Sequence, residues 1–213
     1  MWRKALRVLF WIAVACGVIA GIVALFFTTW TVPGDDPQLA VSIEPALSPG
    51  DFVLVTRGTG ASDGALVRCA DPDAPGRYVI GRVIAHGGDN VEFNAGTLLV
   101  NDQVPASPVA CEPRDAHLRN PATQEDVDLN CYLEELAGTT HPVLRNAGGK
   151  TLDRDLKTTV EPGKVYLVSD DRALHLDSRD FGPIAPATCQ RIAFRFWGLA
   201  GWSDAKKRLT VLW

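Results

Sequence analysis

Ser42 is a candidate nucleophile, in the stretch VSIEPALSPGDFVLV at residues 41–55. Pro45 and Pro49 restrict the backbone after it, and a run of β-forming residues follows, so we expect a rigid segment to hold the hydroxyl. A serine hydroxyl becomes a useful nucleophile only when a neighbouring group takes its proton. The chain must therefore also supply a base, and histidine suits that role because its unperturbed pKa is about 6.5.

The sequence contains four histidines. His86 lies in a Gly-Gly-Asp turn, and His117 and His141 fall in a polar stretch where we expect them at the surface. His175 lies in the stretch SDDRALHLDSRDFGPI at residues 169–184. No metal site is expected, because the cysteines lack C-x-x-C spacing and the histidines lack the H-E-x-x-H pattern.

The composition is that of a globular protein with one sizeable core. The chain has 213 residues, of which 46% are hydrophobic and 22% charged. The net charge is −4, and Arg3, Lys4 and Arg7 precede every acidic residue, so the rest of the chain is more acidic still. Phosphate binding needs a concentrated basic face, and we therefore expect no nucleic-acid partner. No cofactor is expected either.

A membrane anchor is predicted near the N-terminus. Residues 8–27 read VLFWIAVACGVIAGIVALFF, twenty residues without a charge. At about 1.5 Å per residue, a helix of this length spans a hydrocarbon core of about 30 Å. Because the basic residues lie on the N-terminal side, residues 1–7 are expected in the cytoplasm and the chain after the anchor outside it.

The rest of the chain predicts a mainly β domain at residues 41–213. Short β-type runs, including DFVLV, YVIGRVIAH and RIAFRFW, alternate with Gly, Asp, Asn and Pro clusters. LLVNDQVP predicts a hairpin with its turn at Asn101 and Asp102. Residues 28–40 are polar and contain proline, which is typical of a linker. Residues from about 107 to 161 predict an insertion carried on the sheet.

Four cysteines follow the anchor, in the part expected to be exported, where disulfides can form. They are Cys69, Cys111, Cys131 and Cys189. A bond between Cys111 and Cys131 is the most economical pairing, because it closes a loop inside the insertion. Cys69 and Cys189 would then pair or remain free.

Three segments, in order behind the anchor, resemble those of type I signal peptidase, a membrane-anchored serine protease. They are SIEPALSPGDFVLV, VIGRVIAHGGDNVEF and SDDRALHLDSRDFGPI. LLVNDQVP and CYLEELAGTTHPVL resemble the family's hairpin and inserted region, so the resemblance covers nearly the whole chain. It implies a mainly β fold: a signal-peptidase-type antiparallel β domain with an inserted subdomain, preceded by one N-terminal transmembrane helix.

The resemblance makes Ser42 the nucleophile, but two positions depart from the family. A buried lysine activates the serine in the family, and the matching position, immediately before Arg82, is Gly81, which can accept no proton. The position two before the nucleophile is often a serine that helps to hold the oxyanion, and here it is Ala40. Backbone donors such as the Ser42 N–H must then serve instead.

A third departure suggests a replacement base. His175 matches a family serine that hydrogen-bonds the catalytic lysine. We therefore expect the imidazole of His175 to fill the space that the missing lysine leaves opposite Gly81. There it would form a Ser42/His175 dyad.

Nearby acidic residues are candidates for orienting that imidazole. Asp177 could do so as in a catalytic triad, or could pair with Arg179. Asp170 or Asp171 could do either job, and Asp170 could equally hold Arg82.

The resemblance implies a membrane-bound serine endopeptidase that removes signal (leader) peptides from exported preproteins. Its partners would be exported preproteins and the lipid bilayer of the cell (inner) membrane, which it would cross once. The substrate would bind as an extended strand, with small residues one and three positions before the cut. The alternative is a catalytically inactive homologue that acts as a peptide-binding or assembly subunit, and the missing lysine supports it. A soluble self-cleaving regulator is disfavoured by the anchor.

Overall fold

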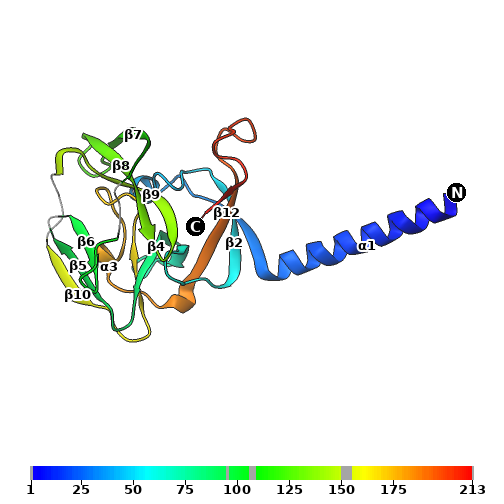
Figure 1. Cartoon of the computed structure of the whole chain (residues 1–213), viewed down its shortest axis with the longest axis horizontal. Helices are drawn as coiled ribbons and strands as arrows, with labels where there is room; N and C mark the ends of the chain where they lie inside the picture. The colour runs from blue at the N-terminus through cyan, green and yellow to red at the C-terminus, as the bar shows by residue number, and fades with distance from the viewer. Residues whose placement is uncertain (1, 95, 106–108, 150–154, 213) are drawn as a thin grey trace.

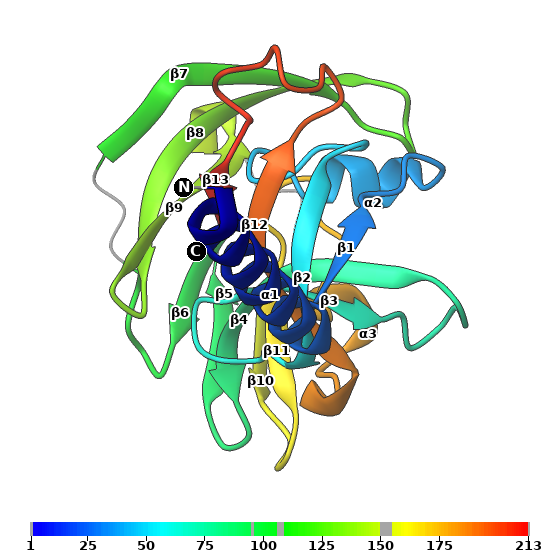
Figure 2. The ribbon, with the colours of Figure 1, turned by 90° about the vertical axis from the view of Figure 1, so that its right-hand side faces the viewer.

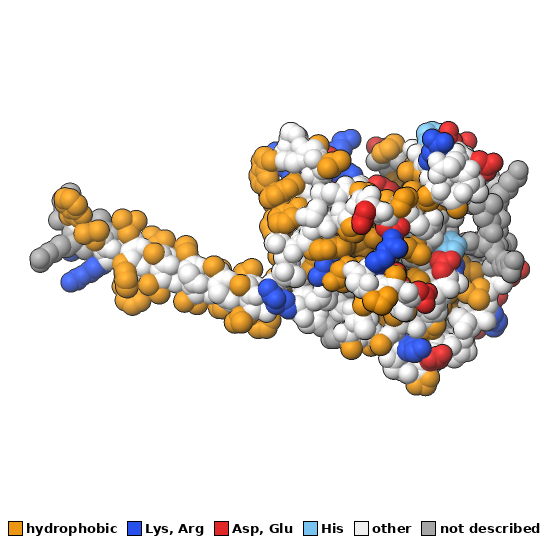
Figure 3. Space-filling view, turned by 180° about the vertical axis from the view of Figure 1, so that it is seen from behind, with side chains coloured by type: hydrophobic (Ala, Val, Ile, Leu, Met, Phe, Trp, Pro, Cys, Tyr) orange, Lys and Arg blue, Asp and Glu red, His pale blue; other side chains and the backbone are white. Residues whose placement is uncertain are grey.

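The computed structural model describes residues 2–94, 96–105, 109–149 and 155–212. Helix α1 (Trp2–Phe26) projects from a β domain (Figure 1). Its candidate membrane span, Leu6–Phe26, has none of its surface buried, and hydrophobic side chains cover it along its length (Figure 3). The predicted anchor is therefore a single helix long and apolar enough to cross a membrane.

The main sheet positions the candidate site. Its strand order is β1-β2-β12-β3-β4-β11, with β13 pairing on β12, and the pairings are antiparallel. The prediction of a mainly antiparallel β fold is confirmed. The strands are β1 (Phe27–Thr31), β2 (Phe52–Thr59), β3 (Leu66–Ala70), β4 (Tyr78–His86), β11 (Val165–Val168), β12 (Cys189–Trp197) and β13 (Thr210–Val211).

The segment 28–40, expected to be a linker, is largely folded. Strand β1 follows α1 without a break and pairs with β2 from Phe27↔Thr56 to Thr31↔Phe52. Thr and Trp favour strands, and the edge of β2 supplies the hydrogen-bond partners. Helix α2 (Pro37–Ser42) begins before the segment ends.

Helix α2 is fixed to the main sheet by the hydrophobic core. Leu39 and Ile43, at its last turn, belong to the same buried cluster as Val53, Ile80 and Ile192 of β2, β4 and β12. The core thus holds the end of α2, where Ser42 lies, against the sheet.

Two smaller sheets complete the domain. One has the order β10-β5-β6 and the other β7-β8-β9. The turn after β6 is confirmed at Asn101 and Asp102, whose φ angles of 50° and 63° suit a tight hairpin turn. The predicted insertion contains β7 to β10, while residues 107–108 and 150–154 lie outside the described ranges. The elements are β5 (Asn90–Asn94), β6 (Thr97–Val100), β7 (Val109–Arg119), β8 (Asp126–Leu136), β9 (Thr139–Asn146), η1 (Ala147–Gly149), β10 (Leu156–Thr159), α3 (Ser178–Phe181) and η2 (Pro186–Thr188).

Two disulfides join neighbouring strands. Cys111–Cys131 links β7 to β8 inside the insertion, as predicted. Cys69–Cys189 links β3 to β12 in the main sheet, so the second pair is also bonded.

Candidate active site

Ser42 is the last residue of α2. Asp36 caps the helix by accepting hydrogen bonds from the N–H groups of Gln38 at 3.0 Å and Leu39 at 3.1 Å, and Pro37 occupies the first turn. Ser42 is 0% exposed, and its hydroxyl donates to the carbonyl oxygen of Leu39 at 3.0 Å. In this state a substrate carbonyl cannot reach the hydroxyl unless the end of α2 moves.

The loop that carries His175 lies along α2. The N–H of Asp171 donates to the carbonyl oxygen of Ser42 at 3.1 Å. One helical turn earlier, the side-chain amide (Nε2) of Gln38 donates to the backbone carbonyl oxygen of His175 at 2.9 Å. One backbone and one side-chain hydrogen bond thus bring together the two segments that the sequence singled out.

The side chain of His175 contacts Asp180. The distance from Nδ1 of His175 to Oδ2 of Asp180 is 2.9 Å, and the imidazole is 18% exposed. The same carboxylate oxygen accepts from the N–H of Asp177 at 3.0 Å as part of the capping box of α3. Asp180 was not among the residues expected at the site, although the Asp-x-x-Asp spacing at the start of a helix is a capping signal.

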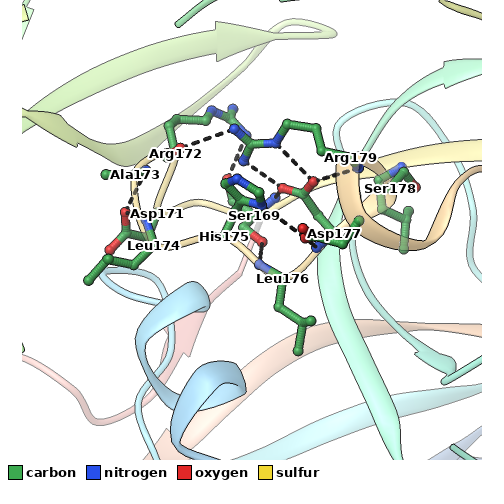
Figure 4. A network of polar contacts seen from close by, with 12 residues as sticks. Ser169, Asp171, Arg172, Ala173, Leu174, His175, Leu176, Asp177, Ser178 and Arg179 are labelled. Atoms are coloured by element: carbon green, nitrogen blue, oxygen red, sulfur yellow. Dashed lines mark hydrogen bonds and ion pairs between the residues drawn. The ribbon is translucent and has the colours of Figure 1, made fainter. Parts of the chain in front are cut away.

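Asp177 is bound by Arg179 (Figure 4). It is fully buried, and Arg179 donates to both of its oxygens, at 3.0 and 2.7 Å. Burial alone would raise the pKa of Asp177, but the Arg179 guanidinium and hydrogen bonds outweigh it and lower the pKa to about 2. His175, Asp177 and Asp180 bring ligand-type atoms within 4.8 Å of one another, but Arg179 occupies the Asp177 oxygens.

Arg82 and Asp170 form a buried ion pair, one of the three alternatives that the sequence allowed for Asp170. Their atoms approach to 2.7 Å, and Arg82 also donates to the carbonyl oxygen of Gly64 at 3.1 Å. Both side chains are almost fully buried. The pair connects β4 to the loop that carries His175.

A side chain at Gly81 would be tightly packed against β11. A Cβ at this position would lie 3.1 Å from the carbonyl oxygen of Val168 and 3.3 Å from Cβ of Leu167. Successive strand residues face opposite sides of a sheet, and Ile80 packs in the cluster that contains the residues of α2. Position 81 therefore lies on the side of β4 opposite to Ile80, beside Val168 and Leu167 of β11. The expected placement of the His175 imidazole opposite Gly81 stays a prediction.

Asp171 is a buried carboxyl group beside the Ser42 backbone. It is 0% exposed; Oδ1 accepts from the N–H groups of Ala173 and Leu174, while Oδ2 has no hydrogen-bond partner among the described residues. Burial raises its pKa to about 7, although the two N–H groups act to lower it.

His141 is buried, which corrects the expectation of a surface residue. It is 2% exposed, with Nε2 lying 3.5 Å from Glu134 and 4.0 Å from Asp170. The strands β8 and β9 fold back onto the loop 170–172, where the N–H of Leu144 donates to the carbonyl oxygen of Asp170 at 2.9 Å. His117 is exposed on β7 beside Asp128, as expected.

Glu134 joins the insertion to the same loop. It is 0% exposed and pairs with Arg172 and, at 3.1 Å, with Arg145. Burial acts to raise the pKa of Glu134, but the charges of Arg172, His141 and Arg145 hold it well below its usual range. The inserted sheet is therefore part of the support of the loop that carries His175.

A family model described as "Signal peptidase, peptidase S26" matches residues 5–197, most of the chain. The chain belongs to this family, whose members are serine endopeptidases that remove signal peptides. No curated protein matches the chain.

Proposed function

We propose that the chain is a membrane-bound endopeptidase that cuts signal peptides from exported preproteins, with Ser42 as nucleophile and His175 as base. The carrying observation is the double link between α2 and the His175 loop, through Asp171 N to Ser42 O and Gln38 Nε2 to His175 O. These links hold the serine and histidine segments at a fixed separation. Catalysis gains most from such fixed placement of the reacting groups.

Asp180 has the contact needed to orient the base. A carboxylate on Nδ1 favours the tautomer in which Nδ1 carries the proton and Nε2 has the lone pair. Nε2 would take the Ser42 proton as Oγ attacks the scissile carbonyl. The imidazolium would then give that proton to the leaving amine, and water would hydrolyse the acyl-enzyme.

Activity requires the last turn of α2 to open. The Ser42 hydroxyl is buried and bonded to Leu39 O, and in an α-helix the N–H of Ser42 points to the carbonyl four residues earlier. Opening this turn would free the nucleophile and an oxyanion donor together. A substrate strand bound beside α2 would supply the free energy for that change.

The proposed location is the cell (inner) membrane, crossed once by α1 with the N-terminus in the cytoplasm. Its support is the exposed apolar span Leu6–Phe26 and the basic residues before it. Protease added to sealed spheroplasts should digest the β domain and leave an N-terminal tag protected. Protection of the β domain would reverse the proposed orientation.

A catalytically silent homologue that binds peptides is the second candidate. Two observations favour it: Ser42 has no exposed surface, and a side chain at Gly81 would meet β11. Purified full-length chain, incubated in detergent micelles with a preprotein, separates the two. Cleavage that Ser42→Ala abolishes supports the peptidase, whereas binding of the preprotein without cleavage supports the silent homologue.

A further inference from the structure

Helix α1 projects from one side of the β domain, beside β1 and β2 of the main sheet (Figure 2). Two open cavities lie at this side, each lined by residues of α1 and of the main sheet. Both are lined by Phe27. One, of about 780 Å³, has the polar side chains of Arg191, His86 and Thr56 in its wall. The other, of about 580 Å³, is an apolar groove along α1 that includes Ile19, with Arg57 at its edge. We call the first the polar cavity for these side chains, although most of its surface is apolar, and it adjoins the apolar groove.

The position of each cavity relative to the bilayer follows from the residues of α1 that line it. The groove is lined by α1 residues from Cys16 to Ala24, and the polar cavity by Phe26, where the candidate span ends. Eight residues of helix rise about 12 Å, close to the thickness of one leaflet's hydrocarbon, about 15 Å. The groove therefore lies at the level of acyl chains and the polar cavity at the level of headgroups.

The charged side chains that line the two cavities favour the binding of an anion. Nε of Arg191 is buried and has no hydrogen-bond partner among the described residues. Nε of Arg57 donates to the carbonyl oxygens of Ala24 and Phe27, each at 2.9 Å, which holds a second guanidinium at the end of α1. Of the described residues that line the two cavities, none is acidic, although Asp63 lies 2.6 Å from His86 and offsets any charge on it.

We propose that the two cavities together bind one anionic phospholipid of the extracytoplasmic leaflet. Its phosphate would accept charge-assisted hydrogen bonds from Arg191 and lie near Arg57, and one acyl chain would lie in the groove along α1. The proposal rests on the membrane location proposed above and not on catalysis. Such a lipid would fix the tilt of the β domain on the bilayer.

Native mass spectrometry of the full-length chain, released from nanodiscs of equal parts phosphatidylglycerol and phosphatidylcholine, tests this proposal. We expect retained phosphatidylglycerol, and about a fivefold loss of it in Arg191→Gln, since one basic residue near a membrane surface contributes about 1 kcal/mol. Gly58→Phe should also lower retention, because its Cβ meets nothing within 4 Å and the ring would enter the polar cavity without removing charge. Arg119→Gln on β7 is the matched control and should change nothing.

Three results would overturn the proposal. The first is equal retention of phosphatidylglycerol and phosphatidylcholine by the parent chain. The second is unchanged retention of phosphatidylglycerol in both Arg191→Gln and Gly58→Phe. The third is displacement of the lipid by millimolar glycerol phosphate, which would mark a site for soluble anions. Preprotein cleavage by the same sample reports separately on the proposed peptidase.

Discussion

The N–H of Asp171 donates to the carbonyl oxygen of Ser42, so the residue after the Arg82 partner is bonded directly to the candidate nucleophile. A chain of contacts therefore runs from β4, through Arg82 and Asp170, to the end of α2. It explains how segments far apart in the sequence are held at one place. It also makes the site sensitive to changes in the loop 169–177.

Gln38→Ala should lower kcat/KM for preprotein cleavage about fivefold. The variant loses the hydrogen bond that fixes the His175 carbonyl to α2, worth about 1 kcal/mol, and with it the placement of the imidazole. Gln103→Ala, at an exposed position after the β6 turn, is the control. Equal kcat/KM values for the two variants would show that this link does not position the base.

Asp180→Asn should lower kcat about tenfold and leave KM nearly unchanged, because the carboxylate contacts the base and not the peptide. Asp128→Asn is a matched control, since it alters an exposed His–Asp pair, the one with His117. A rise in KM alone would instead assign Asp180 to substrate binding.

Asp171→Asn should change how stability depends on pH. The pKa of Asp171 is raised from 3.8 to about 7 in the folded chain, so between these values the folded state holds more protons than the unfolded state. The free energy of unfolding therefore falls as pH rises through this window. Between pH 4 and 8, the free energy of unfolding of Asp171→Asn should fall by about 2–4 kcal/mol less than that of the parent chain.

Urea unfolding of the isolated full-length chain at several pH values measures this difference. Asp115→Asn, an exposed residue of β7, should keep the parent's pH dependence. Parallel curves for Asp171→Asn and the parent would show that the buried carboxyl group does not titrate in this range.

Glu134→Gln should destabilise the fold by about 3 kcal/mol, because it leaves the buried Arg172 and the partly exposed Arg145 without their carboxylate. The neighbouring Glu135 is exposed, and Glu135→Gln should change stability by less than about 0.5 kcal/mol. Denaturant unfolding compares the two, and equal values would contradict a supporting role for the insertion.

Sequence patterns predicted the features that depend on local chemistry. The apolar N-terminal helix, the β runs, the turn at Asn101 and Asp102, and the Cys111–Cys131 bond each follow from spacing and residue type, and each is confirmed. That this helix anchors the chain in a membrane stays a prediction. The Arg82–Asp170 pair was one of three open alternatives for Asp170.

Features that depend on tertiary packing could not be read from the sequence. His141 lies in a polar stretch and yet is buried, because β8 and β9 fold back onto the loop 170–172. Asp180 reaches His175 only because the short helix α3 turns back on the loop before it. The packing of β11 against Gly81 depends on strand pairing across most of the chain.

Preprotein cleavage by the full-length chain between pH 5 and 9, compared with Ser42→Ala and His175→Gln, tests the central claim most directly. We expect Ser42→Ala to abolish cleavage, His175→Gln to lower it at least about 100-fold, and the parent's rate to fall below about pH 6.5 as a histidine base becomes protonated. His117→Gln, on the exposed strand β7, should cleave at the parent's rate. Cleavage by Ser42→Ala or His175→Gln as fast as by the parent would contradict the Ser42/His175 dyad.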